Sequence, residues 1–196
     1  MQSLKRISCC WCRTLIKKQK NNFKKYIMKK ILFTLSIFLF FACVSNDDKA
    51  KIDGANQFVS GIEKFEINKE LADKGFDTFE SGDLEGLFAL VSDDLIWNPP
   101  HVDSLSKEDY VSGMKGWHSE FENFKFTERQ YFPGVDDSLY LPNGSVRAYG
   151  VWKYNHKASG TEFSTKYYSV SEFDETGLQT TIYEFFDRGD IFLKLQ

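Results

Sequence analysis

Apolar residues recur at three- and four-residue steps from Asn56 to Glu80, a spacing that places them on one face of a helix. The sequence Ser81-Gly82-Asp83 ends this helix, and Asp83 is a suitable N-cap for a second, shorter helix. A third helix is predicted to start at Ser106, where Ser-x-x-Asp resembles a capping box. The apolar stripe of this third helix consists of Tyr110, Met114, Trp117, Phe121 and Phe124.

The C-terminal part of the chain is rich in aromatic and β-branched residues, which favour strands. Gly-containing turns divide it into four strand segments: FKFTERQYF, SVRAYGVWKYN, TEFSTKYYSVSEF and LQTTIYEFFD. The turn at residues 156–160 joins two long segments and therefore predicts an antiparallel hairpin. Helices followed by consecutive strands predict an α+β domain, in which three helices pack on the concave face of a curved antiparallel sheet.

The N-terminal part contains a targeting signal. Met28-Lys29-Lys30 is followed by the apolar run ILFTLSIFLFFA and then by Cys43. The run is too short for a membrane span of roughly 20 residues, and a polar segment follows it, which disfavours a buried core helix. The segment resembles a bacterial lipoprotein signal, which implies that Cys43 is lipidated and becomes the mature N-terminus. We therefore expect a lipid-anchored protein of the cell envelope, at the outer membrane or cell surface of a Gram-negative bacterium.

This reading divides the chain into four parts. Residues 1–27 form an extension ahead of a second start at Met28, residues 28–43 the signal peptide, residues 44–56 a flexible polar tether and residues 57–196 the domain. The cluster Cys9, Cys10 and Cys12 lacks the fourth ligand that a zinc site requires.

Charge and histidine spacing exclude several partners. Residues 1–43 hold ten Lys and Arg and no acid, so residues 44–196 carry 28 acidic and 15 basic side chains, a net charge of −13. Nucleic acid and anionic lipid heads are therefore poor partners for the domain. His101, His118 and His156 are scattered and form no helical metal-binding pair, so we expect neither a metal nor another cofactor.

The run GFDTFESGDLEGLFALVSDDLIWNPP, followed by the Ser106 helix and four strands, resembles the SnoaL-like branch of the nuclear transport factor 2-like superfamily. The resemblance covers roughly residues 57–190. It implies a cone-shaped, cystatin-like α+β fold with a strongly curved antiparallel sheet and three helices on its concave side. Because this scaffold carries isomerases, cyclases, dehydratases and binding modules alike, function has to be argued from the site.

The resemblance implies that this chain lacks most of the catalytic residues known in the superfamily. Ketosteroid isomerases of the superfamily use an aspartate as general base at the position of Asn98, and an amide cannot take that proton at neutral pH. Their tyrosine and protonated aspartic acid correspond to positions near Phe76 and Ser169. Polyketide cyclases place an aspartate near the end of the last strand, which corresponds to Asp187, but their assisting histidine corresponds to a position near Phe173.

We expect ligand contacts inside the cone and at its rim. The two prolines of Asn98-Pro99-Pro100-His101 stiffen a rim that presents an amide, and strand alternation places Tyr183 and Asp187 on one face. The predicted ligand contacts are Trp97, Asn98, His101, Trp117, His118, Trp152, Tyr154 and Tyr183. Two alternatives remain open: the rings are equally compatible with a packed core, and Asp187 with a strand end in water or a pair with Arg188 or Arg147.

Three functions fit these observations. The first, which we favour, is an exported lipoprotein that binds a small, largely apolar or aromatic ligand and lacks a complete catalytic set. The second is a cyclase, dehydratase or hydrolase with Asp187 as general acid/base. The third is a dimeric interaction module, a homodimer formed through the open sheet.

Overall fold

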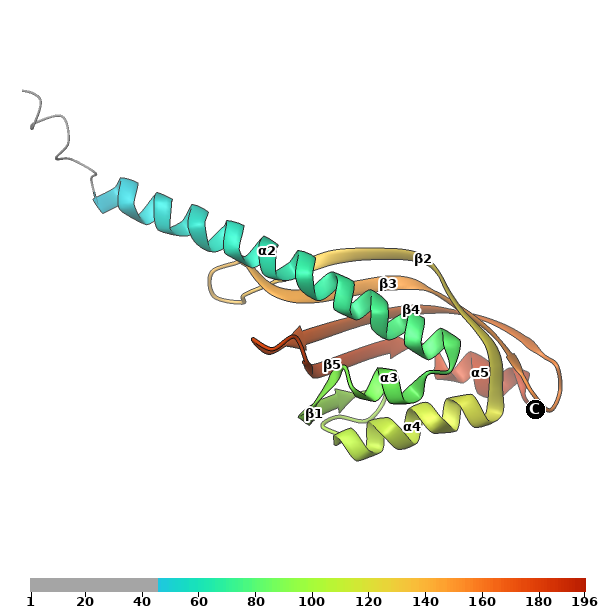
Figure 1. Cartoon of the computed structure of the whole chain (residues 1–196). Helices are drawn as coiled ribbons and strands as arrows, with labels where there is room; N and C mark the ends of the chain where they lie inside the picture. The colour runs from blue at the N-terminus through green and yellow to red at the C-terminus, as the bar shows by residue number, and fades with distance from the viewer. Residues whose placement is uncertain (1–45) are drawn as a thin grey trace, which may run out of the picture. The chain divides into compact units, whose positions relative to one another are not determined.

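The computed structural model describes residues 46–196 (Figure 1). Cys43, the signal peptide and the upstream extension lie outside the described residues. Contacts divide the chain into two units, residues 1–52 and residues 53–196, and the second unit is the domain considered below. Within the described part of the chain, no helix is both long and apolar enough to cross a membrane.

The domain has the α+β architecture that the sequence predicted. Its elements are α2 (Asn46–Ser81), α3 (Leu84–Phe88), β1 (Val91–Asn98), α4 (Lys107–Glu120), β2 (Phe121–Val135), β3 (Pro142–His156), β4 (Glu162–Phe173), β5 (Gln179–Phe186) and α5 (Arg188–Lys194). Both predicted helix caps are present. The Asp83 carboxylate accepts a hydrogen bond from the Gly86 N–H, and Ser106 and Asp109 form the capping box of α4.

Three element boundaries differ from the prediction. Residues 46–56, expected as a flexible tether, are the beginning of α2, and the short helix α5 was not predicted. Phe121 and Phe124 belong to β2, not to the third helix. Both rings nevertheless face the core, because a β-bulge between Glu122 and Lys125 inserts an extra residue into the strand. A three-residue step between apolar residues, which is typical of a helix, arises here from a bulged strand.

The five strands form one sheet in the order β1-β5-β4-β3-β2. The pairs from β2 to β5 are antiparallel, and the predicted hairpin joins β3 to β4, with Asn155 opposite Glu162. In contrast to the expected all-antiparallel sheet, β1 pairs with β5 in parallel. A parallel pair requires a long crossover connection, and the chain supplies it through α4 and the strands β2 to β4.

One arginine attaches the first helix to the sheet. Arg129 of β2 donates to Asp73 and Asp77 of α2 at 2.6 and 2.8 Å, and it also pairs with Glu80. Glu80 in turn accepts a hydrogen bond from the Phe126 N–H at 2.7 Å. Because these groups are partly buried and linked in a network, they hold the second half of α2 across the sheet, where Figure 1 shows it with α3 and α4 on the same side.

The opposite face of the sheet carries a row of aromatic rings. Phe132, Tyr149, Tyr168 and Phe185 come from four neighbouring strands and contact one another in sequence, with ring centroids 4.5 to 5.8 Å apart. Half of the Phe132 and Phe185 surface is exposed. This is the surface through which the expected homodimer would form, and dimerisation itself stays a prediction.

Candidate functional site

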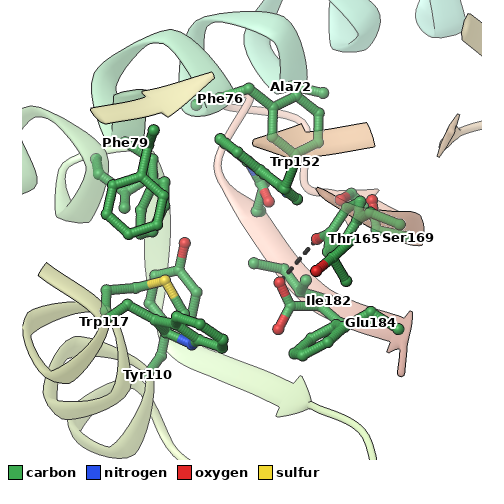
Figure 2. A pocket seen from close by; sticks show the side chains of 18 of the residues that line it. Ala72, Phe76, Phe79, Tyr110, Trp117, Trp152, Thr165, Ser169, Ile182 and Glu184 are labelled. Carbon is green, nitrogen blue, oxygen red and sulfur yellow. Dashed lines mark hydrogen bonds between the residues drawn. The ribbon is translucent and has the colours of Figure 1, made fainter. Parts of the chain in front are cut away.

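A cavity of about 90 Å³ lies between α2, α4 and the concave face of the sheet (Figure 2). At roughly 10–15 Å³ for each water on this measure, it has room for about six to nine water molecules. It is therefore smaller than the 300–1,000 Å³ that is usual for drug-sized ligands. The space is suited to a ligand of about one ring.

One wall of the cavity is aromatic. Its rings come from α2, α4 and the first long strands of the sheet: Phe76, Phe79, Trp117, Phe124 and Trp152. Trp152 stacks on Phe126 with ring centroids 4.7 Å apart and meets the edge of Phe79 at 5.3 Å. These neighbours fix the orientation of the indole ring, so the wall presents a preformed apolar surface.

The facing wall is polar and is built by β4 and β5. Thr165, Ser169 and Ser171 occupy alternate positions of β4 and therefore share the face that lines the cavity. Gln179 and Glu184 of β5 line the same space. All of these side chains except Glu184 are buried and neutral, so the wall offers hydrogen-bonding groups with a single ionisable carboxyl among them.

Glu184 is the chemically distinctive residue of the cavity. Trp97 Nε1 donates to its Oε2 at 2.7 Å, and the Tyr167 hydroxyl donates to its Oε1 at 2.7 Å. Burial raises the pKa of the Glu184 carboxyl, and the two hydrogen bonds oppose that rise without cancelling it. Figure 2 shows this carboxyl directed into the space that faces Tyr110 and Trp117.

Tyr110 of α4 is a second polar group of the cavity that can still form hydrogen bonds. Its side chain is buried and lines the cavity, and its hydroxyl hydrogen-bonds to none of the described residues. Burial, and after it the nearby charge of Glu184, raises the pKa of the Tyr110 hydroxyl, so the group remains neutral at physiological pH. A neutral hydroxyl can both donate to a ligand and accept from one.

The structure corrects the predicted face of the last strand. Tyr183 and Phe185 are 40% and 52% exposed on the outer face, whereas Ile182, Glu184 and Phe186 line the cavity. Residues paired directly across a sheet share a face, and Glu184 lies opposite the inward-facing Ser169. The alternation was predicted correctly, but the wrong set of residues was assigned to the interior.

Asp187 lies outside the cavity. It is exposed and caps the N-terminus of α5, where its Oδ1 accepts a hydrogen bond from the Asp190 N–H at 3.2 Å. Of the readings that the sequence left open for Asp187, the structure agrees with a strand end in water and not with a carboxylate that points into the cone, because the strand ends at Phe186 and the chain turns into a helix. The sequence held a signal for Glu184: a single acidic residue on the face of Ile182 and Phe186.

Three of the predicted contact residues, Trp117, Trp152 and Tyr154, line the cavity. Trp97 does not line it and reaches it only through the hydrogen bond to Glu184. Asn98 is buried at the end of β1, where its Oδ1 accepts from the Ser104 N–H at 2.8 Å and its Nδ2 has no partner among the described residues. The contacts that these residues make with a ligand stay predictions.

None of the three histidines lines the cavity. His101 is exposed, with a φ of 77°. His118 packs against the rings of Phe79 and Phe124 at 4.6 and 4.7 Å, and burial lowers the pKa of its imidazole. His156 approaches Glu120 at 3.9 Å. Among residues 46–196 no group of three or more His, Cys, Asp or Glu side chains is arranged to hold a metal ion.

Comparison with solved structures shows the fold of the domain. A candidate polyketide cyclase from Xanthomonas campestris pv. campestris is 10% identical, with a TM-score of 0.57 over 68% of this chain and 99% of that chain. PrhC from Penicillium brasilianum is 18% identical, with a TM-score of 0.56 over 67% and 89%. A nuclear transport factor 2-like protein of unknown function from Burkholderia pseudomallei is 13% identical, with a TM-score of 0.54 over 65% and 95%.

No family model matches the chain, and no curated protein matches it either. At these low identities the structural likeness shows the fold of the domain but not its activity. The domain has the cone-shaped nuclear transport factor 2-like fold, as the sequence resemblance implied.

The raised pKa of the Glu184 carboxyl makes the stability of the domain depend on pH. Because the pKa of Glu184 is raised above its ordinary 4.5, its contribution to stability is complete below that value and is lost as the pH rises through the raised pKa. Glu184→Gln carries no charge and does not undergo this loss. We therefore expect the difference in free energy of unfolding, variant minus wild type, to increase as the pH is raised from about 4 to about 8.

Urea unfolding at several pH values measures this difference. Glu162→Gln is the control, because it removes an exposed carboxylate from the neighbouring strand β4. The same pH dependence in both variants, or none in Glu184→Gln, would contradict the assignment.

Proposed function

We propose that the domain binds a small, largely apolar ligand of about one ring between the aromatic and the polar wall of its cavity. The observation that carries this proposal is the pairing of a preformed wall of rings with convergent polar groups that have hydrogen-bonding capacity left, in one concave space. The rings supply apolar contact area. The Tyr110 hydroxyl and the Glu184 carboxyl supply the hydrogen bonds that orient the ligand.

A packed core, the alternative that the sequence left open, explains this interior less well. Protein interiors are close-packed and contain few voids larger than a water molecule, and genuinely empty cavities are apolar. This cavity is larger than one water and is lined by a carboxyl, hydroxyls and an amide. Several of these groups are hydrogen-bonded within the protein, but the Tyr110 hydroxyl is not and the Glu184 carboxylate has acceptor sites left, which a ligand or water would use.

Filling the cavity should abolish binding. Gly75 of α2 lines it, and the nearest atoms that a Cβ at this position would meet are Gln179 Nε2, at 3.5 Å, and Leu87 and Leu90, at 3.9 and 4.0 Å, all at ordinary contact distance. Gly75→Leu should therefore occupy the space and eliminate saturable binding of the single-ring probe benzyl alcohol. Gly75→Ala should keep binding and stabilise the helix by roughly 1 kcal/mol.

Tryptophan fluorescence reports the titration, since Trp117 and Trp152 line the cavity, and thermal unfolding checks that both variants are folded. If Gly75→Leu is folded and binds benzyl alcohol like the wild type, the ligand site is elsewhere. If no single-ring probe binds the wild type, whether it is neutral or charged, the proposed function fails.

We further propose that this domain works outside the cytoplasmic membrane, anchored through a lipidated Cys43. The support is the sequence signal alone: a cationic start, a twelve-residue apolar run and a small residue before cysteine. Replacing Cys43 by Ser should move the full-length protein from the membrane to the soluble fraction in a bacterial host. Unchanged membrane association, with intact processing of a known lipoprotein as the control, would contradict lipidation.

Acid/base catalysis is the second candidate, and Glu184 takes the place first given to Asp187. The observation in its favour is a carboxyl that lies in the cavity, is held by two hydrogen bonds and has a raised pKa. These are properties of a general acid or base. The neighbouring Tyr110 hydroxyl could stabilise an oxyanion.

Proton exchange tests this candidate without a known substrate. Phenylacetone carries exchangeable hydrogens beside its carbonyl, and NMR in deuterated water follows their loss. If Glu184 acts as a base, Glu184→Gln should reduce the protein-dependent exchange rate by roughly 10²- to 10⁴-fold, and Asp187→Asn should leave it unchanged. An exchange rate no faster than in buffer would leave binding as the function.

A further inference from the structure

We propose that the ligand of this cavity is a small organic ammonium ion, whose positive charge lies between the Glu184 carboxylate and the surrounding rings. This inference rests on the proposed binding function and specifies the chemical class of its ligand. Three features of the cavity carry it: the sign of its charge, the free hydrogen-bonding capacity of the carboxylate, and the aromatic faces around it.

The charge in the cavity is unbalanced. Glu184 is its one carboxyl, and the lining includes no Lys, Arg or His, all lining residues lying within the described part of the chain. The nearest strands carry basic residues on their other side: Arg147 and Lys166 line a separate groove on the outer face of the sheet. A cation from the ligand would neutralise a charge that the protein leaves unpaired, whereas an anionic ligand would add a second one.

The Glu184 carboxylate is held in position but still has unused hydrogen-bond acceptor sites. Trp97 and Tyr167 each donate one hydrogen bond, one to each oxygen, and an ionised carboxylate has about four acceptor sites. Both donors are neutral, so they orient the group without neutralising it. Two acceptor sites therefore remain for the N–H groups of an ammonium ion, and the Tyr110 hydroxyl, free of hydrogen bonds to the described residues, can accept another.

Aromatic rings enclose the space around this carboxylate. Tyr167 packs near Phe186, Trp152 and Phe76, with ring centroids 6.1 to 6.3 Å from its own. The face of an aromatic ring attracts a cation that lies within about 6 Å, and cages of such rings recognise alkylammonium groups. An apolar molecule would use the rings alone, but an ammonium ion uses both the rings and the carboxylate.

The net charge of the whole domain also favours a cationic ligand. With 28 acidic and 15 basic side chains in residues 44–196, the domain attracts cations and repels anions over a Debye length of about 8 Å at physiological ionic strength. This general effect has to be separated from the local one in any test. A second carboxylate outside the cavity provides the required control.

The experiment compares three probes that share one ring and differ in charge: benzylamine, benzyl alcohol and benzoate. Their dissociation constants are measured by calorimetry at neutral pH for the wild type, Glu184→Gln and Glu162→Gln. Glu162 is exposed on β4, so its variant removes the same unit of charge without altering the cavity. We expect the wild type to bind benzylamine at least tenfold more tightly than benzyl alcohol, and benzoate most weakly.

Glu184→Gln should lose the preference for benzylamine and still bind benzyl alcohol, which also shows that its cavity is intact. Glu162→Gln should keep the preference. If benzyl alcohol or benzoate binds the wild type as tightly as benzylamine, the ammonium inference is overturned while the binding function stands. If the two variants lose the preference equally, the preference comes from net charge and the inference is likewise overturned. If none of the probes binds, both proposals fall.

Discussion

A carboxylate inside an aromatic cone can be retained only if its oxygens have hydrogen-bond donors, and this requirement shapes the centre of the domain. Glu184 meets it with Trp97 Nε1 and the Tyr167 hydroxyl. These donors come from β1 and β4, the two strands that flank β5. The parallel pairing of β1 with β5 therefore brings the indole to the carboxylate. The hydrogen bonds join three strands around one charged group.

The cavity exists because small and large residues face each other across the interior. Most of the rings project from α2, α4 and the strands β2 and β3, while β4 presents Thr165, Ser169 and Ser171 beside a single ring, Tyr167. Gly75 leaves further space on the helix side. In a close-packed interior, serines opposite aromatic rings leave a void unless another molecule fills it. The polar wall gives this void a chemical character that an accidental packing defect would lack.

The same fold occurs in proteins whose described activities differ, including candidate polyketide cyclases and a candidate isomerase from Bacillus subtilis. At identities of 10 to 18% these structures establish how the chain folds and leave its chemistry to be argued from the site. In this chain the site has one carboxyl, several neutral hydroxyls and no basic group among its lining residues. This composition is what favours a cation as the ligand.

The sequence by itself determined the elements and their order. The apolar periodicity predicted α2, Asp83 and Ser106 marked helix starts, and the turn residues separated the strands, because these signals are local in the chain. It also determined which residue types were available, so Trp117, Trp152 and Tyr154 could be assigned to the interior.

Only the tertiary structure decided which face of each strand is inside. Alternation is symmetric, so one residue of register separates Tyr183 and Phe185 on the outer face from Glu184 in the cavity. In β2 a bulge interrupts the alternation, so Phe121 and Phe124 both point inward although they are three residues apart. The pairing of Glu184 with Trp97, 87 residues away in the chain, depends on the parallel contact between β1 and β5. Because no local signal specifies that contact, the chemistry of the site became visible only in the folded chain.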